Sequence, residues 1–240
     1  MLCTNPPSLL TVNMPLYFDD DEDITDTIRD AVFERDGDDC WLCGEVSHIH
    51  IAHQIAASAF RHPFPLFKAN GTIDIPDLSH PDNLIPLCPT CYVGYDSSFP
   101  DWIMVPDADT LRHYINYEKE DYERRQGSQG PGSLQGALQG RTLPSIDRTK
   151  VLYYPMILRD DFRLRRIEVD WPKHWQGDPT TVIHRSAWHG ILDSNPIRPI
   201  GLGFGGRIFN RGIDPLYPGL IRELMRLWSR APRWTRYVYY

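Results

Sequence analysis

Two pairs of cysteines stand at the same short spacing in different parts of the chain. Cys40 and Cys43 form one C-x-x-C pair, in CWLCG, and Cys88 and Cys91 form the other, in CPTC. Four thiolates in two such pairs match the tetrahedral coordination of a structural zinc ion, which would join two distant turns into one unit. The alternative, four unrelated buried cysteines, is disfavoured because two pairs seldom share one offset by chance.

The composition limits the classes to which the protein can belong. The chain has 240 residues, 21 prolines, a formal net charge of -7 and a mean hydropathy of -0.42. No apolar run reaches the roughly 18 residues of a membrane span, and the N-terminus lacks the basic region and the cleavage site of a signal peptide. We therefore expect an intracellular protein, nuclear or cytoplasmic, in whose reducing compartment paired cysteines bind metal more often than they form disulfides.

The sequence pattern divides the chain into four regions. Residues 1–23 form a proline-punctuated N-terminal arm, and residues 24–125 form the region that contains the cysteines. Residues 126–142 are rich in Gly, Ser and Gln, the composition of a flexible linker. Residues 143–240 form a C-terminal region of uncertain fold, basic where the first part of the chain is acidic. Such a basic region can contact nucleic acid or the acidic part of its own chain.

Local periodicity predicts several elements around the cysteines. Apolar residues recur at helical spacing from Ile24 to Gly37, and residues 109–125 and 220–230 also have helical patterns. HIHIAH, residues 48–53, alternates as a strand does. A proline-broken loop of about 30 residues follows, which is long enough that a metal or a function is expected to account for it.

The motifs between the two cysteine pairs resemble those of the HNH endonuclease family, in particular the single-domain variants found in fungal proteins. The similarity is carried by RDGDDCWLCG, IHIAHQIAAS and NLIPLCPTCYVGYD, and it covers residues 24–105. It implies an α+β fold in which a ββα-metal unit holds one divalent cation. It also implies that the zinc bound by the four cysteines connects the ends of that unit.

The resemblance assigns three signature positions. His53 matches the general base, which deprotonates the attacking water, and a histidine suits this role because its ordinary pKa lies near neutrality. Asn83 matches the amide that holds the loop and so orients the base. The third position is residue 92, where the family has a metal-binding His or Asn and this chain has Tyr92.

The chain departs from the family at two positions that hold the catalytic cation. Ala52 stands where an Asp or another ligand precedes the base, and Tyr92 carries a phenol, a poor ligand for Mg²⁺ or a similar hard cation. Two substitutes are conceivable. His50 shares a strand face with Ala52, and Asp96 follows Tyr92 by one helical turn.

These observations leave three hypotheses. The first is an HNH-type nuclease that hydrolyses nucleic acid, with DNA as the expected substrate, using structural Zn²⁺ and a catalytic Mg²⁺ or other divalent cation. The second is a catalytically degenerate module of the same fold that binds nucleic acid or protein. The third, ranked last, is a zinc-ribbon regulator unrelated to nucleases, which leaves the placement of His53 and Asn83 as coincidence.

Overall fold

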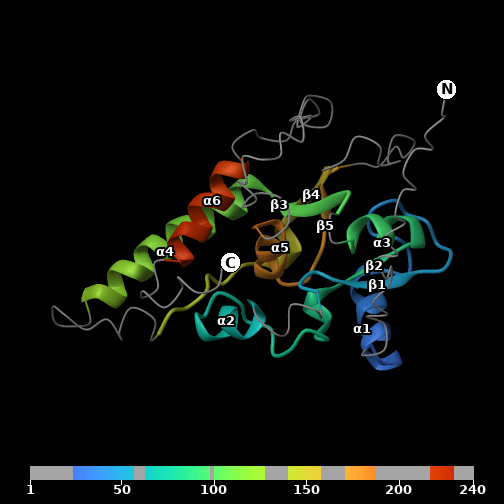
Figure 1. Ribbon diagram of the computed structural model, residues 1–240, viewed down its shortest axis with the longest axis horizontal. Coiled ribbons are helices and arrows are strands. Elements are labelled where there is room, and N and C mark those ends of the chain that lie inside the picture. The colour runs from blue at the N-terminus through green and yellow to red at the C-terminus, as the bar shows by residue number, and fades with distance from the viewer. Residues whose placement is uncertain are drawn as a thin grey trace, which may run out of the picture.

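The computed structural model describes residues 24–56, 63–97, 100–127, 140–157, 171–187 and 217–229. Helices and strands are mixed along the sequence, so the α+β class predicted for the chain is confirmed (Figure 1). The predicted N-terminal arm, residues 1–23, lies outside the described residues.

Two antiparallel sheets organise the described elements. The helices are α1 (Asp26–Asp36), α2 (Pro63–Ala69), α3 (Pro89–Tyr95), α4 (Ala108–Gly127), α5 (Pro179–Ser186) and α6 (Tyr217–Trp228), with short 3₁₀ turns at Pro81–Asn83 and Arg148–Lys150. The strands are β1 (His50–His53), β2 (Leu84–Leu87), β3 (Trp102–Pro106), β4 (Leu152–Ile157) and β5 (Lys173–His174). One sheet has the order β1-β2 and the other β3-β4-β5.

Helix α1 confirms the helix predicted between Ile24 and Gly37. Thr25 caps its first turn by accepting a hydrogen bond from the N–H of Ile28 at 3.4 Å. Gly37 ends it at φ 91°, a left-handed value that favours glycine. Its apolar face, which includes Val32, packs with Ile51 of β1 and Leu84 of β2. Helix α1 therefore covers one face of the β1–β2 pair.

The β1–β2 pair places the candidate residues in register. His50 lies opposite Leu87, Ala52 opposite Ile85 and His53 opposite Leu84. Ala52 packs into a cluster that contains Cys40, Cys88, Cys91 and Tyr95. Since neighbouring side chains of a strand point to opposite faces, β1 presents Ile51 to α1 and Ala52 to the cysteines and α3.

The long connection between β1 and β2 contains more structure than its prolines indicate. Helix α2 starts at Pro63, and the 3₁₀ turn starts at Pro81. Proline is tolerated in the first turn of a helix because the N–H that it lacks has no intrahelical acceptor there. The predicted proline-broken loop therefore contains one short helix and one 3₁₀ turn.

The second sheet combines strands from both sides of the predicted linker. Strand β3 pairs with β4 along its whole length, from Trp102 opposite Ile157 to Pro106 opposite Tyr153. Helix α5 lies against β3, where the hydroxyl of Ser186 donates to the carbonyl of Met104 at 2.8 Å. Residues 128–139 of that linker lie outside the described residues, while α4 extends to Gly127. The flexible linker and the domain boundary there remain predictions.

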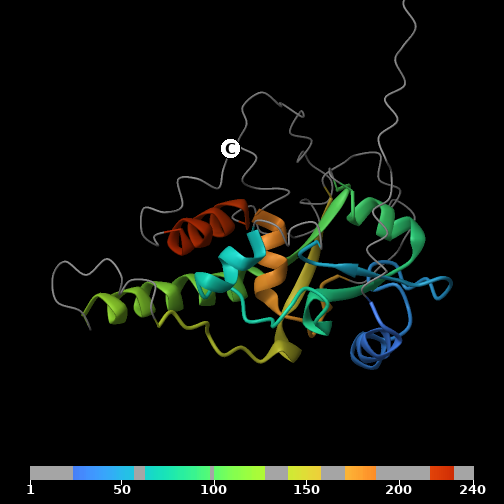
Figure 2. The same cartoon turned by 60° about the horizontal axis from the view of Figure 1, so that its bottom comes forward.

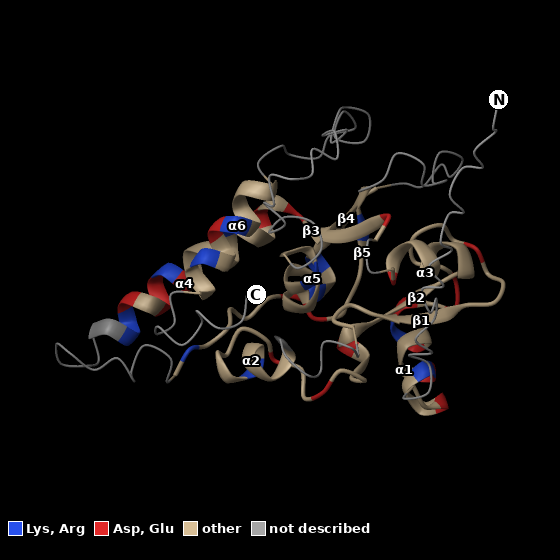
Figure 3. Cartoon of the chain, viewed as in Figure 1, with Lys and Arg blue, Asp and Glu red and all other residues tan. Residues whose placement is uncertain are grey.

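Helices α4 and α6 lie side by side at one end of the molecule (Figures 1 and 2). Buried residues of α6 pack against α4 and β3, and Tyr114 meets Trp228 edge to face with ring centroids 6.3 Å apart. The amphipathic helix predicted at 220–230 is thus present, shifted toward Tyr217. Charged residues recur along the two helices (Figure 3). On α6, Arg222 and Arg226 are exposed.

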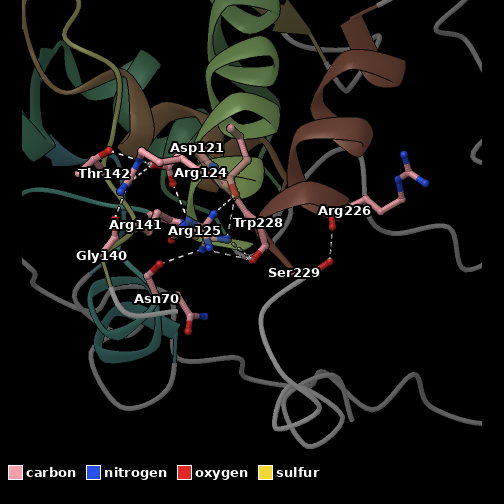
Figure 4. Close-up of polar contacts among 12 residues, drawn as sticks. Asn70, Asp121, Arg124, Arg125, Gly140, Arg141, Thr142, Arg226, Trp228 and Ser229 are labelled. Carbon is pink, nitrogen blue, oxygen red and sulfur yellow. Dashed lines mark hydrogen bonds and ion pairs between the residues drawn. The ribbon is translucent and has the colours of Figure 1, made fainter. Parts of the chain in front are cut away.

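Buried charges connect this helix pair to the rest of the chain (Figure 4). Arg141 donates to Glu118 of α4 at 3.0 Å, to the Asn70 carbonyl at 2.8 Å and to the Trp228 carbonyl at 3.4 Å. Arg125 also donates to Glu118, at 2.8 Å. Burial raises the pKa of Glu118, although the two arginines oppose that shift. Arg141 therefore holds α4, α6 and the end of α2 together.

We predict that Arg141→Met lowers the free energy of unfolding by about 2–3 kcal/mol, because it breaks a buried ion pair while Arg125 still faces Glu118. Urea denaturation measures this. Arg112→Met, which removes a solvent-exposed pair with Asp109, is the control and is expected to cost less than about 1 kcal/mol. Equal losses in the two variants would contradict this interpretation of the cluster.

Candidate metal centre and active site

The first cysteine pair is held in a tight turn against β2. The N–H of Cys40 donates to the Glu45 carbonyl and the N–H of Gly44 to the Cys40 carbonyl, each at 2.7 Å. Gly44 has φ 75°, which a side chain would disfavour. The N–H of Trp41 donates to the Pro86 carbonyl of β2 at 2.9 Å. The turn is therefore attached directly to the strand that leads to the second pair.

The second pair lies at the start of α3. Cys88 is the N-cap residue, Pro89 begins the helix and Cys91 lies in its first turn. The N–H of Tyr92 donates to the Cys88 carbonyl at 2.8 Å, and the indole of Trp102 donates to the Cys91 carbonyl at 3.1 Å. Because strand β2 ends at Leu87, strand, cysteines and helix form one continuous unit.

The four sulfur atoms form a compact cluster. In the described ranges they are the one group of three or more His, Cys, Asp or Glu ligand atoms gathered closely enough to hold an ion, all within 4.8 Å of one another. The Cys43 and Cys88 sulfurs are 3.6 Å apart, far beyond the length of a disulfide bond. A tetrahedral zinc site with Zn–S bonds of about 2.3 Å requires sulfurs about 3.8 Å apart. The cluster can therefore bind a metal such as zinc.

The protonation of the thiols is consistent with a cation site. A hydrogen bond from Cys91 lowers the pKa of Cys40 to about 5, while burial raises the pKa of Cys43 to about 12 and the hydrogen bond to Cys40 raises that of Cys91. Four thiolates packed this closely would repel one another unless a positive charge lay among them. A divalent cation supplies that charge and displaces the protons.

The C-terminal region contributes groups that surround the first cysteine turn. Lys173 of β5 donates to the Trp41 carbonyl at 2.8 Å, and the indole of Trp41 donates to the His174 carbonyl at 2.8 Å. The rings of Trp41 and Trp171 lie 5.3 Å apart. The sequence gives no sign of this contact, since no motif marks a two-residue strand.

Asn83 connects the backbone around the candidate base. Its side chain is fully buried. The side-chain oxygen accepts from the N–H of Ile55 at 2.9 Å, and its amide nitrogen donates to the carbonyls of Ile55 at 3.1 Å and Leu78 at 2.8 Å. The N–H of Gln54 donates to the Asn83 carbonyl at 2.7 Å. Asn83 thus holds the segment that follows His53.

His53 is the last residue of β1, and its side chain is only 2% exposed. In this conformation the ring is closed off from bulk water. A reaction at His53 therefore requires that the groups covering the ring move when a substrate binds.

His50, Tyr92 and Asp96 lie together beside α3. The rings of His50 and Tyr92 have centroids 5.2 Å apart, and the Tyr92 hydroxyl lies 3.5 Å from a carboxylate oxygen of Asp96. Asp96 follows the last residue of α3 as its C-cap. Tyr92 therefore contacts both residues that were predicted to substitute for the missing cation ligands. Ala52 is 1% exposed and offers no ligand.

A basic residue with no sequence motif contacts the end of β1. Arg185 of α5 donates to the carbonyls of His53 and Gln54, each at 3.1 Å, and to the carbonyl of Tyr95. No motif surrounds Arg185 in the sequence, so only the fold shows this placement.

No family model, curated protein or solved structure gives a match to this chain. The HNH resemblance therefore remains an expectation from the motifs. Among the helices that the structure describes, none combines the length and the apolar character needed to cross a bilayer.

We predict that the purified chain contains about one zinc ion, because the cluster supplies four sulfur ligands. Elemental analysis of Cys91→Ser should show loss of most of the metal, together with a lower unfolding midpoint. Cys3→Ser, which changes the cysteine outside the two C-x-x-C pairs, is the matched control and should keep the zinc. The metal centre would be refuted if the natural chain contained no metal and Cys91→Ser unfolded at the same midpoint as the natural chain.

We predict that Asn83→Leu lowers the free energy of unfolding by about 3 kcal/mol, since it leaves three buried backbone groups without their partners. Hydrogen exchange at the Ile55 amide should accelerate at least about tenfold, equivalent to about 1.4 kcal/mol. Asn70→Leu is the control, because within the described chain the Asn70 side chain forms no hydrogen bond. Unchanged protection at Ile55 would show that Asn83 does not hold this segment.

Proposed function

We propose that this chain is an HNH-type nuclease that hydrolyses phosphodiester bonds of nucleic acid, with DNA as the substrate. The observation that carries the proposal is the Asn83 side chain, which bridges the backbone at Ile55, two residues after His53. The antiparallel β1–β2 pair followed directly by α3, with a cysteine pair at its end, supports the same assignment. A zinc ribbon alone does not require a buried amide in this position.

In this proposal His53 is the general base. A neutral imidazole accepts a proton from water as the water attacks phosphorus. Arg185 binds the carbonyl of His53, and Asn83 binds the backbone of Ile55, two residues later. The imidazole therefore starts from a defined position on β1 when substrate uncovers it.

His50 and Asp96 are the residues that would hold a catalytic cation. They offer one imidazole and one carboxylate, so substrate phosphate oxygens must complete the coordination. When bound, a divalent cation such as Mg²⁺ stabilises the charge that develops on the phosphate and the leaving oxygen. Tyr92 supplies a phenol beside both residues and weakens the site.

The contacts of Tyr92 favour a second candidate function. The phenol of Tyr92 contacts both His50 and Asp96, and Ala52 offers no atom that could bind a cation. This arrangement also suits a protein that has the nuclease fold but no longer catalyses the reaction. Such a module would bind nucleic acid or protein through the zinc-stabilised unit. The acidic balance of the first part of the chain supports this candidate, because acidic surfaces repel phosphates.

Nicking of supercoiled plasmid in Mg²⁺ or Mn²⁺ separates the two candidates. We predict that the natural chain nicks DNA and that His53→Ala reduces the rate at least about 100-fold, the usual contribution of a general base. Tyr92→His should raise the rate about tenfold by adding an imidazole ligand, equivalent to about 1.4 kcal/mol. His113→Ala, which changes an exposed histidine of α4, is the control.

The remaining outcomes decide between the two candidates as well. If the natural chain does not nick DNA but Tyr92→His does, the site is a degenerate one on the nuclease fold. If no variant nicks DNA, the nuclease is excluded and the binding module is supported.

A further inference from the structure

Arg185 of α5 contacts two elements of the candidate site, β1 and α3. One terminal nitrogen donates to the carbonyls of His53 and Gln54, each at 3.1 Å, and the other donates to the carbonyl of Tyr95. The guanidinium carbon lies 3.7 Å from the centre of the Tyr95 ring. The side chain is buried. In two views α5 lies between the α4–α6 pair and the unit formed by β1, β2 and α3 (Figures 1 and 2).

The three carbonyls belong to the ends of two elements. His53 is the last residue of β1, and Tyr95 is the last residue of α3. The last carbonyls of a helix have no partner within it, so a buried end needs an outside donor. A guanidinium has five donors in a rigid plane and can reach both ends at once, which the single ammonium group of lysine cannot do.

The segment after His53 is therefore held from two directions. Arg185 fixes the carbonyls of His53 and Gln54, while Asn83 pairs with both backbone groups of Ile55. The Tyr95 hydroxyl also donates to the side chain of Gln54. Strand β1 and helix α3, which carry His53 and Asp96, thus meet at one guanidinium from the C-terminal region.

The burial of Arg185 is explained better by the contacts that it forms than by a gain in stability. Within the described chain it forms no ion pair with a carboxylate, and carbonyl dipoles and the Tyr95 ring compensate its charge instead. Burying a charge is costly, and a well-packed apolar side chain in such a place is often as stable or more so. A buried arginine here is therefore explained by what it positions.

We propose that Arg185 is a positioning residue, which fixes the backbone of His53 relative to α3, so that α5 of the C-terminal region completes the candidate site. The consequence for catalysis rests on the proposed nuclease function. The position of the His53 ring does not, and it is measured separately.

The test is NMR of the full chain labelled at its histidine rings, with the His53 signals identified by their loss in His53→Ala. In Arg185→Met, which keeps most of the aliphatic stem, the His53 signals should shift or split while those of the exposed His113 stay in place. Arg185→Lys should give a smaller change, since one ammonium replaces part of the contacts. Unchanged His53 signals in Arg185→Met overturn the proposal.

Arg141→Met is the matched control for general loosening. Arg141 is also buried and also donates to carbonyls, those of Asn70 and Trp228, but its partners lie outside β1 and α3 (Figure 4). Its loss should lower stability without moving the His53 signals. An equal shift in Arg141→Met would assign the effect to destabilisation and refute a positioning role.

Kinetics add a second readout if the natural chain nicks DNA. Arg185→Met should then lower kcat at least about tenfold, which corresponds to an increase of about 1.4 kcal/mol in the activation free energy. KM should change little, because the substrate contacts remain while the orientation of His53 is lost. A change in KM alone would contradict the proposal. If the natural chain is silent, the proposed function fails, while the NMR result still decides the role of Arg185.

Discussion

The structure of this chain depends on the convergence of four thiol groups at one point. Cys40 and Cys43 lie in a turn that binds the edge of β2, while Cys88 and Cys91 lie where β2 passes into α3. A single tetrahedral ion bound at this point would fix the turn, the strand and the helix relative to one another. It would also hold α3, which packs with Ala52, in the position that brings Tyr92 beside His50.

The residues that stabilise this unit differ from those proposed to carry out the chemistry. The cysteine cluster contributes to folding whether or not a reaction occurs nearby. The chemistry proposed for the chain depends instead on His53, on the groups around Tyr92 and on the contacts that hold them. A change at Tyr92 would therefore affect the proposed reaction and leave the four-cysteine cluster intact. This is why a nuclease and a non-catalytic descendant remain the two functions to compare.

Local signals predicted the parts of the structure that local physics determines. The C-x-x-C spacing predicted the cluster of four cysteines, and capped or periodic segments predicted α1, β1 and α6, because these features depend on residues close together in the sequence. The resemblance assigned His53 and Asn83. The pairing of β3 with β4, the contact of Lys173 with Trp41 and the placement of Arg185 had no such signal. They join residues far apart in the sequence, so they appear only when the chain is folded.

We propose that these four sulfurs bind one ion that holds the first cysteine turn, β2 and α3 together. X-ray absorption at the zinc edge of the purified chain is the decisive measurement. We expect each zinc ion to have four sulfur neighbours at about 2.3 Å. A first shell of nitrogen and oxygen atoms, or of fewer than four sulfurs, would contradict it.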